Sequence, residues 1–241
     1  MAMGSVPGMT ASDPMRPTSL DHVALWTAER DRHAALLCEH LGMHEIERTD
    51  AFTLVGVDAR EGKLTLFDAP APRDVGALVR VVLRVGDLAG ALDRLPEELA
   101  ATRDGDVATF EGPEGLVLGL VERPGCELDY DLDHVELRVS DVESAAGALE
   151  EFGFERDGER LVVKDRFVRL LNGGAPEGER PLLNHLAVLV DSASAVEAAA
   201  RERGAEVVEV KDAANTLAVF LWGPDRIKVE YVEHKPSFSL V

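Results

Sequence analysis

Residues 132–139 read LDHVELRV, and this stretch sets the pattern on which most of the chain is built. Its apolar residues Val135, Leu137 and Val139 fall on one face of a β-strand, and the polar residues between them fall on the other. Asp141 follows directly as a helix start, and an Ala- and Leu-rich stretch comes next. The pattern predicts a strand that leads into a helix packed on the apolar face.

The same pattern occurs four times. Opening strands are expected at 20–26, 78–85, 132–139 and 184–190, each followed by a helix. Three of these helices are expected to end at a glycine, namely Gly42, Gly153 and Gly204. Aligning the opening strands places four residues at the same position, with intervals of 58, 54 and 51 residues: His22, Arg80, His134 and His185. A period of this size indicates a repeated supersecondary unit.

The ends of the units agree as well. Residues 112–122 (GPEGLVLGLVE) align without a gap with residues 223–233 (GPDRIKVEYVE), and both are a Gly-Pro turn that feeds an alternating strand. Each unit is therefore β-α-β-β-β. One helix covers only one face of such a small sheet, so the other face needs a partner unit. The sequence predicts an α+β fold in which four βαβββ modules form two paired, cup-shaped half-barrels.

We expect consecutive modules to pair. This divides the chain into a flexible tail at 1–18, an N-terminal module pair without a metal site at 19–122, a linker at 123–131, a C-terminal metal-binding module pair at 132–235, and a C-terminal tail at 236–241. The linker assignment rests on Pro124 and Gly125.

Composition excludes several classes of protein. Hydrophobic residues make up 46% of the chain, which suffices for a packed core, but no apolar run reaches the roughly 20 residues that cross a bilayer. The net charge of −20 repels phosphate backbones and argues against a nucleic-acid partner. The first residues show no basic stretch followed by an apolar one, so secretion is not indicated, and the two cysteines form no disulfide framework. A cytoplasmic location is therefore the expectation.

Two positions in each module should face the cup, one on the first strand and one on the last. The occupants of the last-strand position are Leu66, Gly119, Leu170 and Glu230. In the N-terminal pair, His22 would lie beside Arg80, which stays protonated and repels a cation, so His22 is interpreted as a structural residue.

The C-terminal pair offers a different donor set. His134, His185 and Glu230 supply two imidazoles and one carboxylate, the ligand set of non-haem Fe(II) sites. We therefore predict a divalent metal at these three residues. Fe(II) is favoured, and Mn(II) or Zn(II) would also fit the ligand types.

These residues resemble the vicinal-oxygen-chelate superfamily, which includes glyoxalase I, bleomycin-resistance proteins, methylmalonyl-CoA epimerases and extradiol dioxygenases. The resemblance lies in residues 132–135 (LDHV), residues 183–186 (LNHL), and the Gly223-Pro224 turn leading to Glu230. The four-module layout looks most like a type I extradiol dioxygenase. That resemblance implies Fe(II) or Mn(II) in the C-terminal half and a catechol-type substrate that chelates the metal through two neighbouring oxygens.

The chain departs from the extradiol pattern at the residues that would move protons. Asp165 and Arg166 stand where the family usually places an acid/base histidine, the stretch 211–214 lacks the second histidine, and Phe220 replaces a tyrosine. Glu136, on the cup face, and Asp165 are the remaining candidates for catalytic residues.

Three functions stay open. The first is an extradiol-type oxygenase, and the second is a glyoxalase-type lyase, isomerase or epimerase, although Leu170 stands where such sites commonly have a second glutamate. The third is a binding or antibiotic-resistance protein without turnover. Aromatic residues make up 5% of the chain, which argues against a stacking site for a bound ligand. Each alternative has a small-molecule partner, and a monomer or homodimer is expected.

Overall fold

The computed structural model describes residues 13–173 and 181–241, and it contains the four predicted units. The first unit consists of β1 (Ser19–Thr27), α1 (Arg30–His40), β2 (His44–Arg48), β3 (Phe52–Gly56) and β4 (Lys63–Asp68). The second consists of β5 (Leu78–Val85), α2 (Leu88–Asp93), β6 (Thr102–Asp104), β7 (Val107–Glu111) and β8 (Val117–Glu122), with the 3-10 turn η1 (Pro113–Gly115) before β8.

The second half of the chain repeats this order. The third unit consists of β9 (Asp131–Val139), α3 (Val142–Glu151), β10 (Glu155–Asp157), β11 (Arg160–Val163) and β12 (Arg166–Asn172). The fourth consists of β13 (Leu183–Leu189), α4 (Ala193–Glu202), β14 (Val207–Asp212), β15 (Thr216–Trp222) and β16 (Lys228–His234), with η2 (Pro224–Arg226) before β16. The predicted α+β fold of four βαβββ modules is confirmed.

The modules pair differently from the prediction. One eight-stranded sheet has the order β14-β15-β16-β13-β1-β4-β3-β2 and joins the fourth unit to the first. The other has the order β10-β11-β12-β9-β5-β8-β7-β6 and joins the third unit to the second. The expectation that consecutive modules share a sheet is therefore wrong. All four opening strands carry the same local pattern, so the strand pattern alone does not select which of them pair.

Consecutive units instead contact each other outside the sheets, through a turn of one unit and the strand-to-helix connection of the other. In the first half, the Glu114 carboxylate of η1 accepts a hydrogen bond from the backbone N–H of Ala28 (3.1 Å), where β1 turns into α1. In the second half, the Asp225 carboxylate of η2 accepts one from the backbone N–H of Ser140 (2.6 Å). Both acidic residues have positive φ, 53° and 49°, so the two turns share a conformation as well as a role.

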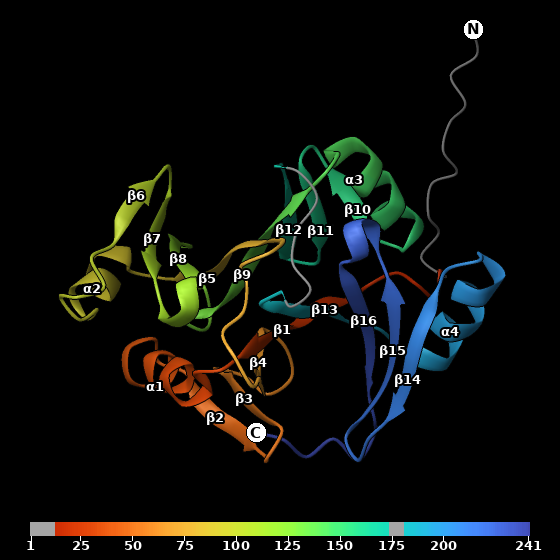
Figure 1. The fold of residues 1–241 in the computed structure, drawn as a ribbon, viewed down its shortest axis with the longest axis horizontal. Coiled ribbons are helices and arrows are strands. Elements are labelled where there is room, and N and C mark those ends of the chain that lie inside the picture. Colours follow the sequence, from red (N-terminus) through yellow and green to blue (C-terminus); the bar gives the residue numbers. More distant parts are fainter. Residues whose placement is uncertain (1–12, 174–180) are drawn as a thin grey trace, which may run out of the picture.

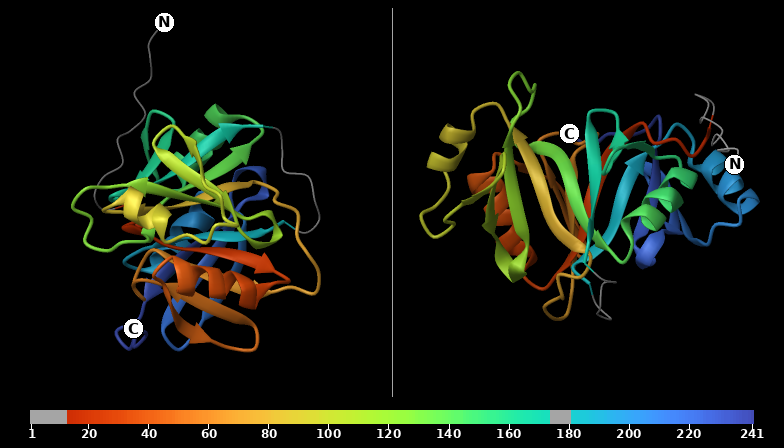
Figure 2. Two further views of the ribbon diagram at one scale, coloured as in Figure 1. Left: turned by 90° about the vertical axis from the view of Figure 1, so that its left-hand side faces the viewer. Right: turned by 90° about the horizontal axis from the view of Figure 1, so that it is seen from above.

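Each sheet has one face in the main core and one face in a cup. Helix-facing residues of both sheets, such as Val135, Leu186 and Tyr231, belong to a single buried cluster. Residues on the opposite faces form two small separate clusters, one in each sheet. Helices α2 and α4 lie at opposite ends of the long axis of the molecule (Figures 1 and 2). No helix among the described residues has the length and apolarity to cross a membrane.

Residues 13–18 and the C-terminal segment after β16 both contact the rest of the fold. Met15 is fully buried, and Asp13 pairs with Arg203 of the segment after α4 (2.8 Å), so residues 13–18 pack onto the body; residues 1–12 lie outside the described part. At the other end, Phe238 stacks on His234 with ring centroids 4.2 Å apart. The C-terminal segment runs from β16 towards β2, at the opposite edge of the same sheet (Figure 1).

Candidate metal centre

The sheet that joins the first and fourth units brings three potential metal ligands onto one cup face. In the antiparallel pair β1–β13, His22 lies opposite Ala187 and Ala24 lies opposite His185. In the parallel pair β13–β16, Ala187 lies beside Glu230. The sheet register thus places His22 and Glu230 in one row of residues and His185 in the next row.

The donor atoms of these three residues converge. The His22 and His185 Nε2 atoms are 3.0 Å apart, and Glu230 Oε2 lies 2.7 Å from His185 Nε2 and 3.2 Å from His22 Nε2. Among the described residues, this is the group of histidine, cysteine and acidic side chains whose geometry suits a metal ion. Three mutually adjacent ligands at bond lengths of about 2.1 Å around an octahedral ion would be roughly 3.0 Å apart. The donor set therefore fits one face of such a coordination sphere.

Neighbouring side chains aim both imidazoles at this point. Asp21 Oδ2 lies 2.7 Å from His22 Nδ1, and Asn184 Oδ1 lies 3.0 Å from His185 Nδ1. Each Nδ1–H can donate to its neighbour, which leaves the Nε2 lone pair directed into the cup. Asp21 also accepts from the buried Lys63 Nζ (2.8 Å). The orienting contacts expected around metal-bound histidines are thus in place.

The charges of the site favour a cation. Burial opposes ionisation of Glu230, but the adjacent His185 and His22 outweigh this and hold the pKa of its carboxyl well below the usual range. Burial would lower the pKa of His22, but hydrogen bonds with Asp21 and Glu230 raise it to about 9. Burial lowers the pKa of His185. A site that holds a proton this firmly between an imidazole and a carboxylate can exchange that proton for a metal ion.

His134, predicted as a ligand, lies in the other sheet. Its Nδ1 is 2.6 Å from Asp133, its Nε2 is 3.7 Å from Glu136, and its ring stacks on Phe167. It therefore does not join His185 and Glu230, and His22 takes the place predicted for it. The physical reason is strand pairing, because β13 hydrogen-bonds to β1 and not to β9.

The two predicted catalytic residues also lie away from the cluster. Glu136 is buried in the second cup and forms an ion pair with Arg80: its carboxylate accepts a hydrogen bond from Arg80 Nη2 at 3.0 Å, and Arg80 Nε lies 2.7 Å away. Burial opposes its ionisation, but His134 and Arg80 lower the pKa of Glu136 to about 2, so it is a poor general base. Asp165 pairs with Arg84 at 2.5 Å in the turn between β11 and β12. Neither residue is placed to move a proton at the cluster.

Within residues 13–173 and 181–241, the second cup has no comparable ligand set. Sheet register makes Arg80, Gly119, His134 and Arg169 the equivalents of the positions around the cluster. Glu136 bridges the two arginines, with Arg169 Nη1 3.5 Å away. The guanidinium of Arg80 thus supplies a fixed positive charge where the other cup offers donor atoms.

His22 was expected to be a structural residue beside Arg80, whereas the structure places it beside His185 and Glu230, and no local signal distinguishes the two cases. Residues 20–23 and 132–135 are the same tetrapeptide, LDHV, so both histidines follow an aspartate at the same strand position. The register also corrects the last-strand position of the first unit from Leu66 to Thr65, which pairs with Ala24 as Glu230 pairs with Ala187. The buried hydroxyl of Thr65 therefore stands at the fourth cup-facing position, in the same cup as the three candidate ligands.

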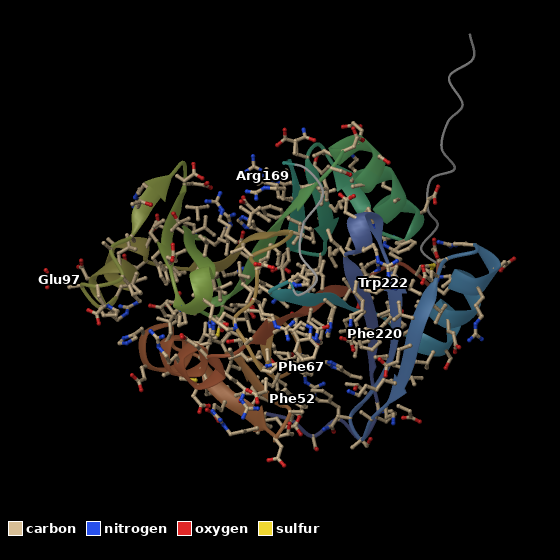
Figure 3. The ribbon with its side chains drawn as sticks, in the orientation of Figure 1. Phe52, Phe67, Glu97, Arg169, Phe220 and Trp222 are labelled. Atoms are coloured by element: carbon tan, nitrogen blue, oxygen red, sulfur yellow. The ribbon has the colours of Figure 1, made fainter. Side chains whose placement is uncertain are left out.

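Aromatic side chains surround the cluster. The Phe220 ring meets the His185 ring edge-on at 5.2 Å, and Phe67 lies 6.2 Å from His185. Trp26 and Phe52 extend the Phe67 side, with centroids 5.3 and 5.7 Å from Phe67. Figure 3 shows Phe52 and Phe67 on the β3–β4 side and Phe220 on the β15 side. The low aromatic content argued against a stacking site, but the fold gathers aromatic residues in this one cup.

Known proteins share the fold. Residues 19–113 match the family model described as "Glyoxalase/Bleomycin resistance protein/Dioxygenase superfamily". A search of curated protein sequences gives no match.

Three solved structures illustrate the similarity. A putative dioxygenase from Bacillus subtilis subsp. subtilis str. 168 superposes with a TM-score of 0.76 at 18% identity, over 92% of this chain and 87% of that chain. Glyoxalase I from Zea mays gives 0.69 at 18% identity, over 89% and 92%. The cppA protein from Streptococcus pneumoniae TIGR4 gives 0.60 at 14% identity, over 90% and 98%. The first part of the chain, residues 19–113, thus resembles this superfamily in sequence, and the chain shares its overall fold with these solved structures.

Proposed function

We propose that the protein is a metal-dependent oxygenase of extradiol type that acts on a small, vicinally oxygenated, catechol-type substrate. The observation that carries this proposal is the convergence of His22 Nε2, His185 Nε2 and Glu230 Oε2, at separations of 2.7 to 3.2 Å, within an aromatic-lined cup. Two imidazoles and one carboxylate on one face are the ligand set of non-haem Fe(II) oxygenases. Mn(II) and Zn(II) also suit these donors.

Each residue has a defined task in this proposal. His22, His185 and Glu230 would hold the ion and leave its remaining positions free for the substrate. A divalent ion there would act as a Lewis acid towards two neighbouring substrate oxygens. Asp21 and Asn184 orient the imidazoles, and Phe67 and Phe220 offer apolar ring faces to a flat substrate while excluding water.

The ligand set favours this function over glyoxalase-type proton transfer. Such sites commonly use a second glutamate, and the register places Thr65 at that position. A threonine hydroxyl has no accessible ionisation near neutral pH and cannot serve as the base. One chain completes the cup, so a monomer suffices for the proposed activity.

Oxygen consumption tests the proposal. Protein loaded with Fe(II) under anaerobic conditions is mixed with a panel of catechols, and oxygen uptake is followed together with the absorbance of ring-cleavage products. We expect uptake with at least one member, and no uptake by Glu230→Ala protein. Metal-loaded protein that consumes no oxygen with any catechol, but exchanges solvent deuterium into a methylglyoxal–thiol adduct, would replace this function by the glyoxalase type.

A further inference from the structure

A lysine stands beside the candidate metal centre. Lys228 is two residues before Glu230 on β16, so both side chains leave the same face of the sheet. The register places Lys228 in the same row as His185 on the neighbouring strand and directly opposite Trp222 on β15. Adjacent strands are about 4.8 Å apart, so the backbone of Lys228 lies next to that of a candidate ligand.

The side chain points along the cup wall and not away from it. Lys228 Nζ lies 5.4 Å from the centre of the Phe220 ring. The same ring meets His185 edge-on at 5.2 Å. The Phe220 ring therefore contacts both the ammonium group and His185, and a flat molecule packed on this ring would reach both Lys228 and the candidate metal centre.

Within the described part of the chain, no carboxylate lies within 4.0 Å of the ammonium group. Lys63, Lys164 and Lys235 each form an ion pair, whereas Lys228 and the exposed Lys211 form none among residues 13–173 and 181–241. The chain has 45 acidic against 25 basic residues, so a partner for a structural lysine would be easy to supply. Lys228 is also partly buried, and a partly desolvated cation is costly without a counter-ion. Glu209 and Glu230 are the acidic residues that act on this charge, but neither lies within 4.0 Å, which leaves room for an anionic group of a ligand as the direct counter-ion.

We propose that Lys228 determines specificity by binding an anionic group, such as a carboxylate, on the substrate of the metal centre. The inference rests on the proposed function, because the two vicinal oxygens of the substrate would lie at His22, His185 and Glu230 while its ring lies against Phe220. The cup then selects acidic catechol-type compounds over neutral ones of the same shape.

Matched pairs of ligands test this directly. The probes are 3,4-dihydroxybenzoate, 3,4-dihydroxyphenylacetate and 3,4-dihydroxyphenylpropionate, each compared with its neutral amide. Binding to Fe(II)-loaded protein is measured by anaerobic titration calorimetry, so the readout does not depend on turnover. We expect at least one acid to bind about tenfold or more tightly than its amide, since a hydrogen bond to a charged group contributes more than a neutral one.

Variants assign the preference to one residue. Lys228→Met should keep the metal content of the wild type and lose the preference, while Lys228→Arg should retain part of it. Lys211→Met is the control, because Lys211 is an exposed lysine on β14, two strands away from β16 in the same sheet. Arg73→Met tests a second cation near the cup, whose guanidinium lies 5.4 Å from the Trp26 ring.

The outcomes separate the two proposals. Two results would overturn the role of Lys228 and leave the proposed function standing. The first is equal binding of acids and amides by the wild type. The second is a preference for acids that survives in Lys228→Met and disappears in Arg73→Met. Metal-loaded protein that binds none of the six compounds overturns both.

Discussion

The Nε2 atoms of His22 and His185 lie 3.0 Å apart, although 163 residues separate the two in the chain. The antiparallel pairing of β1 with β13 produces this contact, and it joins the first module to the last. A metal site at this point would therefore be a long-range property of the fold. Loss of the β1–β13 pairing would abolish it.

Substitution of only one of the two LDHV histidines, His22, should reduce the metal content. His22→Ala removes a donor atom from the cluster, whereas His134→Ala changes the other cup, in which Arg80 supplies the positive charge. We expect His22→Ala to lower metal affinity by roughly 100-fold or more, because losing a ligand should cost at least as much as losing a residue that orients one. His134→Ala should leave the affinity near the wild-type value. Elemental analysis after reconstitution with Fe(II) or Zn(II) measures both; metal loss in His134→Ala alone would contradict the assignment.

The partner that orients His185 should matter for metal affinity. Asn184 Oδ1 lies 3.0 Å from His185 Nδ1 and fixes which nitrogen faces the cup. Asn184→Ala should weaken metal binding by roughly 10-fold, within the range observed for such orienting groups. Competition with a chromogenic chelator gives the affinity. An unchanged affinity would show that the sheet alone positions the imidazole.

The Glu136–Arg80 pair should make the stability of the second cup depend on pH. The pKa of Glu136 is lowered from 4.5 to about 2, so the folded state binds its proton less readily than the unfolded chain. The stabilisation is therefore fully present above about pH 4.5 and is lost as the pH falls towards 2. Glu136→Gln leaves the buried Arg80 with only the exposed Asp104, 3.0 Å away, as a counter-ion and should cost about 3 kcal/mol at pH 7, the lower end of the range for breaking a buried ion pair.

Urea denaturation at pH 7 and pH 3 measures this difference. The gap between wild type and Glu136→Gln should be smaller at pH 3. Glu159→Gln is a suitable control, because Glu159 is exposed and its contact with Arg169 is long, 3.4 Å, so its effect should stay within about 1 kcal/mol. An equal gap at both pH values would mean that the ionised pair is not the stabilising element.

Two helix-ending glycines should differ in their tolerance of a side chain. Gly153 and Gly204 both have positive φ, 97° and 74°, so alanine at either position costs about 1–2 kcal/mol of backbone strain. A Cβ at Gly153 would also lie 2.1 Å from the carbonyl oxygen of Met15, whereas a Cβ at Gly204 meets nothing within 4 Å. Gly153→Ala should therefore be more destabilising by a further 1 to 3 kcal/mol, about the cost of overpacking.

Thermal denaturation compares these two variants. An equal loss of stability in the two variants would show that residues 13–18 can move away from α3 without a further loss of stability.

Much of the fold could be predicted because it rests on local patterns. Strand alternation, helix starts such as Asp141 and turns such as Gly223-Pro224 recur at each module, and the structure has an element at each of these positions. Each pattern acts through neighbours a few residues apart, so sequence spacing is sufficient to detect it.

The partners of the modules could not be predicted in this way. The segments LDHV at 20–23 and at 132–135 are identical, so no local property distinguishes His22 from His134. Their environments differ only because β1 pairs with β13 and β5 pairs with β9.

The sequence by itself therefore determined the βαβββ unit, its four copies and two of the three candidate ligands, His185 and Glu230. The tertiary structure decided the third ligand, the aromatic lining and the free lysine, because these depend on which strands share hydrogen bonds. Strand pairing joins segments that are far apart in the chain, so two identical strands come to lie in different environments.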